Sequence, residues 1–460
     1  MQPPDSLWWS TLGGPVLARA PLTSHLDVDL AIVGGGFTGL WTAREALRRD
    51  PGLRIVVLEK EVCGFGASGR NGGWASAYYP QEWSTVASEV GDDEAGHLRR
   101  TLERAVTDLG LAAHDDGIDA HFTQGGSLTF AHSDLQVARL RDEVDERHRR
   151  GELDLEWLDG DAARERGVTA PMRGAMFTPH CARLHPARLV RGLADAVERL
   201  GGRIAENTAV TRIVGGDGRR QPLVVTAGGT VHATYVVRAT EGYTPTLPGE
   251  RRAVAPLYSL MIATEPQPPA FWREVGFSHY ETFADGRHLI IYGQRTADDR
   301  IAFGGRGAPY HFGSTVEPRY DLRPKIFTLL ENTLRELFPS LTGSITHRWG
   351  GPLAMPRDLS PSVCLDRRTG LASAGGYTGD GVVLSRVAAT ALADLITRPD
   401  HETEFTRLPF VQRAPRRWEV EPLRWLGINS GLSAAAWADH RELRTGRTSR
   451  ASHWIERIMT

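Results

Sequence analysis

The chain has 460 residues, of which 41% are hydrophobic and 24% are charged, and its formal net charge is -2. A chain of this length can bury large cores and form two or more domains. The near-neutral charge provides no broad positive field for a polyanion, so we expect no nucleic-acid partner.

Three cysteines, Cys63, Cys181 and Cys364, are widely separated and form no Cys-x-x-Cys pair. This usage argues against a disulfide framework and against a zinc site, so no metal is expected. Residues 1–20 lack a basic start followed by an apolar stretch, and apolar runs elsewhere are short. We therefore predict neither a signal peptide nor a membrane-spanning helix, and we expect a cytoplasmic protein.

The first strong pattern lies in residues 27–59. Residues 28–33 alternate and then become apolar, as in a buried parallel strand, and glycines follow at once. Residues 38–49 have the apolar spacing of a helix, and residues 54–58 form a second apolar run. The segment therefore predicts a β-α-β unit.

A G-x-G-x-x-G motif, residues 34–39, lies between the first strand and the helix, a position typical of dinucleotide binding. Gly34 permits a tight turn, Gly36 lets the backbone approach a pyrophosphate, and Gly39 allows the helix to pack closely on the strand. The helix start, at Phe37 and Thr38, attracts the phosphate charge.

Glu59 ends the second strand, where its carboxylate can accept hydrogen bonds from ribose hydroxyls, and Lys60 follows it. These features alone do not distinguish FAD from NAD. The next glycine-rich stretch does, because its backbone can approach a flat cofactor and donate N–H groups to phosphate and ring oxygens. Its candidate cofactor-binding residues are Gly66, Ala67, Ser68, Arg70, Asn71, Gly72 and Gly73.

Further along the chain, a strand over residues 127–131 and a charged helix from Ser133-Asp134 to Arg150 form inserted material. Strands and a helix typical of a nucleotide fold resume near residue 186, and residues 251–347 add strands that form a second, substrate-facing layer. A third glycine-rich stretch, residues 375–381, opens an apolar helix over residues 382–396.

These elements predict two interleaved domains and two terminal extensions. The expected parts are an N-terminal arm (1–25), a cofactor domain (26–115, 180–250 and 348–400), a substrate domain (116–179 and 251–347) and a C-terminal helical extension (401–460).

The three glycine-rich stretches, in this order, resemble those of the glycine and D-amino-acid oxidase (DAO) family of flavoproteins. Within that family the chain resembles the branch of gamma-glutamylputrescine oxidases and aminophosphonate oxidoreductases. The resemblance implies an α/β fold, with a Rossmann-like FAD-binding domain and a substrate domain of α+β type built on an antiparallel sheet. It also implies FAD as the cofactor.

By that resemblance, the backbone of Val210 contacts the adenine and Thr240 closes the pyrophosphate side. The third stretch precedes a helix whose positive end faces the flavin, where reduction leaves negative charge. Asp380 is interpreted there as the helix cap. The candidate residues of the third stretch are Gly376, Tyr377, Gly379, Asp380, Gly381 and Val382.

The chain departs from relatives in the family at two places. Residues 349–356 lack the cysteine that attaches FAD covalently in some members, and Cys364 lies too far along, so we expect noncovalent FAD. Sarcosine-type oxidases have a lysine for the substrate carboxylate where this chain has Val383. A terminal amine, a polyamine derivative or an aminophosphonate is then favoured over a simple α-amino acid, with Arg70 or Arg306 as candidate anion partners.

The expected reaction moves a hydride from the carbon of a neutral amine to flavin N5, and the resulting imine hydrolyses to a carbonyl compound. His288 is a candidate to favour the deprotonated amine, because its ordinary pKa is near neutrality. The pocket candidates lie at or near the second-layer strands, and they are Tyr258, His288, Tyr292, Arg306 and Trp349.

Two alternatives stay open at this point: a flavin dehydrogenase of a hydroxy acid or polyol, and a flavoprotein with structural FAD and no turnover. The sequence also leaves open whether O2, with release of H2O2, or another acceptor reoxidises the flavin, and what the oligomeric state is. Trp8 and Trp9 are expected to pack on the fold. Residues 423–437 could form an amphipathic helix, which we expect on the body or in a subunit contact rather than on a membrane surface.

Overall fold

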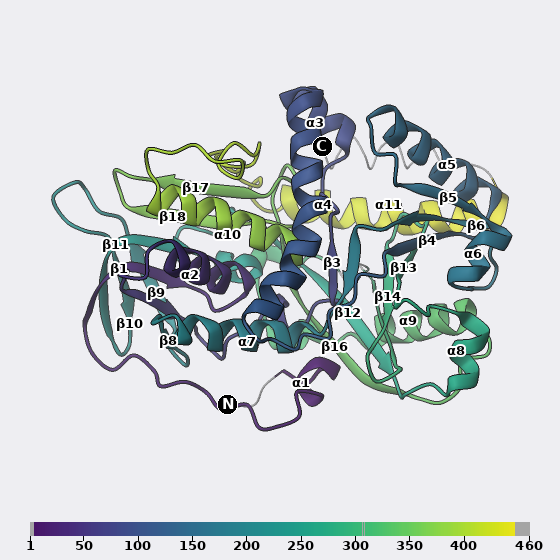
Figure 1. Ribbon diagram of the computed structural model, residues 1–460, viewed down its shortest axis with the longest axis horizontal. Coiled ribbons are helices and arrows are strands. Elements are labelled where there is room, and N and C mark those ends of the chain that lie inside the picture. Colours follow the sequence, from purple (N-terminus) through teal and green to yellow (C-terminus); the bar gives the residue numbers. More distant parts are fainter. Residues whose placement is uncertain (1–3, 306, 308, 447–460) are drawn as a thin grey trace.

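A computed structural model describes residues 4–305, 307 and 309–446 of the chain. It consists of two large sheets, each carrying its own helices, with the long helix α4 (Asp92–Asp115) between the two halves (Figure 1). This arrangement confirms the expected α/β fold with a nucleotide-binding domain and a second, antiparallel domain.

The first sheet is built on parallel strands, and β1 lies at its centre between β2 and β11. The second half of β1 is apolar because both faces are covered there. Antiparallel strands extend the sheet at β17 and through the ribbon of β9 and β10. The strands are β17 (Ser362–Asp366), β18 (Leu371–Gly375), β11 (Gly229–Arg238), β1 (Leu26–Val33), β2 (Ile55–Leu58), β8 (Arg203–Ala205), β9 (Val210–Val214) and β10 (Leu223–Thr226).

Four helices bury their apolar faces in one cluster with this sheet: α2 (Phe37–Arg49), α4, α7 (Pro186–Arg199) and α10 (Gly381–Thr397). In α10 nearly every side chain is buried, which explains the apolar run from Val382 onward. Helix α7 begins with Pro186 in its first turn, where the missing N–H costs nothing, and His185 accepts a hydrogen bond from the N–H of Arg188.

The second sheet is antiparallel except where β13 runs parallel to β4. Its order is β16 (Ile345–Met355), β12 (Ala255–Thr264), β15 (Ile301–Gly305), β14 (Ile291–Arg295), β13 (Thr282–Asp285), β4 (Ser127–Ala131), β6 (Gly174–Thr178) and β5 (Glu156–Asp159). A separate cluster of aromatic and aliphatic side chains, which includes Phe303, Leu334 and Phe338, forms its core. The accompanying helices are α5 (Asp134–Arg149), α6 (Gly160–Arg166), α8 (Pro269–Val275) and α9 (Pro324–Leu337).

The structure moves one of the expected domain boundaries. Strand β16 pairs with β12 from Ile345 to Met355, so residues 348–355, assigned from the sequence to the cofactor domain, lie in the second sheet. The extended pairing of β16 with β12 decides where this segment lies.

The remaining elements are short or peripheral. Strands β3 (Trp74–Ser76) and β7 (Cys181–Arg183) pair with each other between the domains, and α3 (Trp83–Val90) precedes α4. Short 3-10 helices are η1 (Ala67–Gly69), η2 (Glu241–Thr246), η3 (Phe312–Ser314) and η4 (Pro318–Asp321).

The two terminal segments contact the body of the protein. Helix α1 (Leu7–Ser10) buries Trp8 and Trp9, which confirms the expectation for the N-terminal arm. Helix α11 (Leu423–Thr445) covers the residues expected to form an amphipathic helix, and Trp425 and Trp437 are exposed on it. Within the residues described, no helix is long and apolar enough to cross a membrane.

Candidate active site

The three glycine-rich loops, far apart in the sequence, meet at the start of helix α2. The Phe37 N–H donates a hydrogen bond of 2.8 Å to Ser68 Oγ, which ties the second loop to the first. The hydroxyls of Thr38 and Tyr377 lie 3.0 Å apart, which joins the first loop to the third. These contacts bring the cofactor candidates of the sequence together around one helix end.

Two glycines of the first loop have no room for a side chain. Gly34 has a φ of 113°, and a Cβ there would lie 2.4 Å from the carbonyl oxygen of Ala239. A Cβ on Gly39 would lie 2.0 Å from the carbonyl oxygen of Gly34. The turn is therefore compact enough for the backbone N–H groups at the start of α2 to reach a bound anion.

The start of α2 suits a negatively charged ligand in two further ways. Gly36, which has no side chain, occupies the N-cap position, so the N-cap residue itself makes no side-chain capping bond, and the first turn carries no acidic residue. The free N–H groups and the helix dipole together make this end a site for a phosphate.

Glu59 lies beside this turn. Its carboxylate accepts hydrogen bonds from the N–H groups of Gly35, at 2.7 Å, and Glu61, at 2.9 Å. Burial raises the pKa of Glu59 to about 6, against the opposing effect of these two N–H groups. The carboxylate thus stands next to the phosphate-binding turn, as expected for a ribose-binding group.

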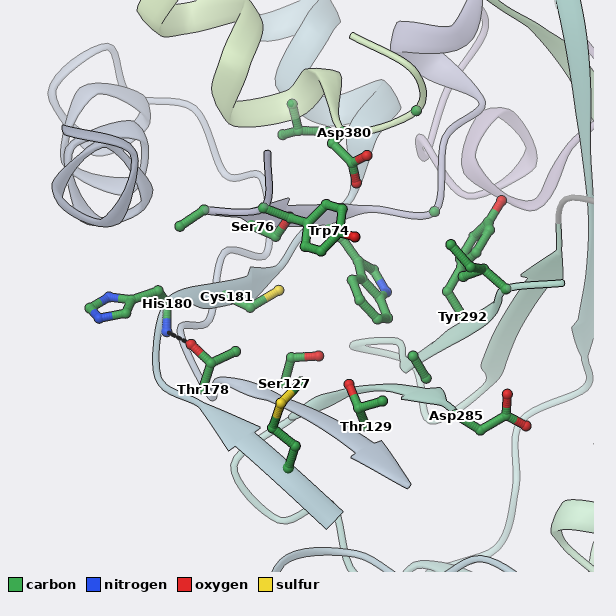
Figure 2. Close-up of a pocket in the computed structure, with 18 of the residues that line it drawn as sticks. Trp74, Ser76, Ser127, Thr129, Thr178, His180, Cys181, Asp285, Tyr292 and Asp380 are labelled. Carbon is green, nitrogen blue, oxygen red and sulfur yellow. Dashed lines mark hydrogen bonds between the residues drawn. The ribbon is translucent and has the colours of Figure 1, made fainter. Parts of the chain in front are cut away.

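A single cavity of about 390 Å³ begins at the second and third loops and opens between the two domains. At the loop end its wall includes Asn71, Gly72, Gly379, Asp380 and Val382. Polar but uncharged groups follow in its middle, and they come from strands β3, β4, β6 and β7 (Figure 2). These middle groups are Trp74, Ser76, Ser127, Thr129, Thr178 and Cys181.

Comparisons with known proteins identify this arrangement. A family model described as DAO, FAD dependent oxidoreductase, matches residues 29–395. The chain belongs to this family of FAD-dependent oxidoreductases. It is 31% identical over 395 residues to gamma-glutamylputrescine oxidoreductase of Escherichia coli, which spans 84% of this chain and 88% of that protein.

Two other similar proteins support the assignment of the chain to this fold and family. The probable oxidoreductase OrdL of Haemophilus influenzae is 27% identical over 394 residues, or 83% of this chain and 85% of that protein. Among solved structures, glycine oxidase from Geobacillus kaustophilus matches with a TM-score of 0.69 at 23% identity, covering 84% of this chain and 99% of that one. The last similarity establishes the fold.

FAD is the cofactor of this family, and the geometry of the DAO-family chain fits it. The glycine-capped start of α2 suits the pyrophosphate, Glu59 suits the ribose, and the cavity reaches the second and third loops. When bound, FAD supplies an acceptor for a hydride. Three further candidates lie elsewhere: Lys60 is largely exposed, Val210 begins β9, and Thr240 Oγ1 lies 2.9 Å from Thr244 Oγ1. Their contacts with FAD remain predictions.

Noncovalent attachment of FAD also remains a prediction. Cys364 lies in strand β17, where its Sγ is 3.0 Å from the carbonyl oxygen of Arg413, and it does not line the cavity. Cys181 does line the cavity, but burial raises the pKa of its thiol to about 12, so this group stays protonated.

Glu241 is a site residue that the sequence analysis did not select. It has a φ of 41°, and its carboxylate accepts hydrogen bonds from the N–H groups of Gly376, at 2.9 Å, and Tyr377, at 3.2 Å. Burial raises the pKa of Glu241 to about 7, although the two N–H groups act in the opposite direction. Glu241 therefore anchors the third loop, and no spacing in the sequence signals this contact.

We expect Glu241→Gln to change how stability depends on pH. The unfolded chain ionises at the usual value near 4.5 and the folded chain near 7, so the wild type loses stability as pH rises between these values. The variant lacks this loss, which amounts to about 3 kcal/mol for such a shift. Urea unfolding of both proteins at pH 5, 6, 7 and 8 measures the difference. Glu402→Gln, which changes an exposed carboxylate, is the control. If the free energy of unfolding of Glu241→Gln varied with pH in parallel with that of the wild type, the prediction would be contradicted.

The second loop is held by Arg70, which the sequence analysis offered as an anion partner. Its guanidinium lies 2.8 Å from Asp321 Oδ2 and donates to the Gly350 carbonyl oxygen, at 2.8 Å, and the Tyr243 hydroxyl, at 2.7 Å. Its side chain is 4% exposed. Arg70 therefore fixes the loop against the second domain, and its guanidinium is occupied by groups of the protein rather than by a substrate anion.

The pocket candidates separate into two groups. Tyr292 lines the cavity, and its hydroxyl lies 2.6 Å from Ser259 Oγ. His288 also lines the cavity, but its ring Nε2 lies 3.1 Å from Glu442 Oε1 of helix α11. Its backbone N–H donates to the carboxylate of Asp439. Its role in deprotonation therefore has no support from this geometry and stays a prediction.

The other pocket candidates do not line the cavity or cannot be placed. Along β12, Ser259 and Met261 line the cavity, whereas Tyr258, on the opposite face, packs in the core of the second domain. Trp349 packs with Trp8, and its indole N–H donates to the carbonyl oxygen of Arg70, so it supports the second loop. Arg306 lies outside the described residues.

The interpretation of Asp380 as a helix cap is wrong. Asp380 occupies the N-cap position of α10 with φ -99° and ψ 31°, and its side chain makes no capping hydrogen bond to the described helix. Figure 2 shows its carboxylate pointing from the start of α10 into the cavity. The N-cap pattern indicated the position correctly but not the direction of the side chain.

Proposed function

We propose that this flavoenzyme oxidises the C–N bond of an amine. The carbon that bears the nitrogen gives up a hydride, the nitrogen loses a proton, and the resulting imine takes up water to release an aldehyde or ketone and the nitrogen fragment. The similarity to gamma-glutamylputrescine oxidoreductase along most of both chains is the observation that carries this proposal.

The substrate we propose is an amine without a carboxylate on the reacting carbon, such as a terminal amine of a polyamine derivative. Val383, at the position of the sarcosine-type lysine, is fully buried and does not line the cavity. Each arginine that the described residues contribute to the cavity wall has a carboxylate partner within 2.8 Å, so these guanidinium groups are already engaged. The pairs are Arg70 with Asp321, Arg99 with Glu103, Arg139 with Glu442, Arg147 with Glu152, and Arg287 with Asp285.

The residues that line the cavity away from the flavin loops support a substrate with a polar group far from the amine. Beyond its neutral middle, the wall includes charged side chains on α4 and α5, among them Glu103 and Arg147. A chain of several carbons would place a polar distal group among them while its amine lies at the flavin loops.

Anaerobic mixing of the holoenzyme with a substrate panel tests the proposal. Terminal amines and γ-glutamyl polyamines should bleach the flavin absorbance, whereas glycine, sarcosine, hydroxy acids and polyols should not. Bleaching by a hydroxy acid and not by any amine would overturn the proposal in favour of a dehydrogenase. Admission of air with peroxide detection then shows whether O2 is the acceptor.

A further inference from the structure

Helix α11, yellow in Figure 1, turns one face to the body of the protein and the other to solvent. Asn429 fixes it to the body, because its side chain exchanges two hydrogen bonds of 3.1 Å with the backbone of Tyr310. The residues of the inner face recur at helical spacing, and they are Arg424, Ile428, Ala435 and Ala438. This attachment determines which side chains the outer face presents.

The outer face of α11 carries large apolar side chains. Leu423 is 60% exposed, Leu426 is 49% exposed, and Trp425 lies exposed between them. Trp437, three turns further along the helix, is 51% exposed. A helix at the surface of a protein usually places polar side chains on its solvent face, so an apolar solvent face marks an interaction surface.

The charges of α11 are divided between its two faces. Among the described side chains of the helix, the exposed charged ones are both basic, Arg441 and Arg444. The two carboxylates of the helix are engaged by the body. Asp439 accepts hydrogen bonds of 2.8 and 2.9 Å from two backbone N–H groups between β13 and β14, and the side chain of Glu442 is 10% exposed. The outer face is therefore apolar and positively charged.

Basic groups stand at both ends of this face. Arg416 and Arg417 are exposed just before the helix, and Glu419, between them and the helix, lies 2.9 Å from an arginine partner. At the other end the guanidinium of Arg441 lies over the ring of Trp437, 5.2 Å from its centroid. Guanidinium and indole are thus presented together, on a helix about 35 Å long.

These groups together complement the surface of an anionic lipid bilayer. Indole rings lie at the level of the headgroups, leucine side chains insert at the acyl boundary, and arginines approach the lipid phosphates. A second copy of the chain would bring the same face, and the described part of its α11 offers no exposed carboxylate to these arginines. The charge of the face therefore favours anionic lipid over a second copy.

We propose that the outer face of α11 binds the surface of a bilayer that contains anionic phospholipids and holds this flavoenzyme there as a peripheral protein. The proposal goes beyond the oxidation of an amine. It departs from the expectation drawn from the sequence, which placed this helix on the body or in a subunit contact. The inner face does lie on the body, but the apolar and basic outer face was not visible in the sequence alone.

Cosedimentation of the FAD-loaded, full-length enzyme with lipid vesicles tests the proposal. We expect the wild type to bind vesicles of phosphatidylcholine and phosphatidylglycerol in a ratio of roughly 7:3, and not vesicles of phosphatidylcholine alone. Binding should weaken several-fold between about 0.05 M and about 0.5 M NaCl, because salt screens the attraction. Arg441→Glu/Arg444→Glu should bind roughly tenfold more weakly or less, and Leu423→Ser/Leu426→Ser should lose about tenfold.

Two double variants serve as matched controls. Arg219→Glu/Arg220→Glu reverses two exposed charges in the connection between β9 and β10, and Leu111→Ser/Leu329→Ser replaces two exposed leucines on α4 and α9. Both should bind vesicles as the wild type does. The ratio of flavin to protein absorbance should stay at the wild-type level in all four variants, because none of the changed residues lines the cavity. If Leu423→Ser/Leu426→Ser were purified without FAD, Trp437→Ser would take its place.

Several results would overturn the proposal. One is a wild type that sediments with neither kind of vesicle, and another is full binding by Leu423→Ser/Leu426→Ser, because simple attraction of charges would not need the apolar face. A dimer in light scattering that dissociates in the same variant would assign the face to a second copy. Retention on a polyglutamate resin without vesicle binding would assign it to an acidic protein. All of these results are independent of whether the enzyme oxidises amines.

Discussion

Gly39→Ala should yield a protein without bound FAD. A Cβ at this position would lie 2.0 Å from the carbonyl oxygen of Gly34 and 3.1 Å from Ile32 Cγ2, and backbone at the first of these contacts cannot move aside without opening the turn. Overpacking of this kind costs about 1–3 kcal/mol or more, and the displaced turn is the one that holds the pyrophosphate. The ratio of flavin to protein absorbance after purification measures the loss.

Gly427→Ala is the matched control for this substitution. Gly427 also lies inside a helix, α11, and a Cβ there meets nothing within 4 Å. The change should leave FAD content at the wild-type level and should stabilise the helix by up to about 1 kcal/mol. Full FAD occupancy in Gly39→Ala would mean that the turn can relax and that close packing of α2 on β1 is not required.

The local parts of the cofactor site could be predicted from the sequence because they depend on neighbours in the chain. The turn from β1 to α2 needs glycine at Gly34, where φ is positive, and at Gly39, where helix and strand touch. A carboxylate at the end of β2, Glu59, follows from the same β-α-β geometry.

The substrate side could be predicted only in part, because it depends on which strands pair and which face each residue takes. Tyr258 and Ser259 are adjacent in β12, yet only Ser259 lines the cavity. One face of this strand packs in the core and the other borders the cavity, and no local sequence pattern tells which face is which. Trp74 comes from strand β3, whose pairing with β7 joins segments far apart in the sequence. The direction of Asp380 likewise depends on the cavity beside the helix.

Arg70 shows the same limit, since its partners come from three separate segments. Arg70→Met should destabilise the protein by about 3 kcal/mol, because it leaves the carboxylate of Asp321 partly buried without its cation. Burial already raises the pKa of Asp321, and Arg70 opposes that rise. We therefore expect a fall of roughly 3 °C in Tm, together with weaker FAD binding, as the second loop loses its connection to Tyr243.

The double variant Arg70→Met/Asp321→Asn separates loss of the ion pair from loss of packing. Removing both charges should recover part of the stability, so its Tm should lie above that of Arg70→Met. Arg54→Met is the control, because Arg54 is 63% exposed and its ion pair with Asp29 lies at the surface, where solvent screens such pairs and they contribute little to stability. A double variant less stable than Arg70→Met would show that Asp321 is stabilised by groups other than Arg70. Thermal unfolding of the three variants beside the wild type decides between these outcomes.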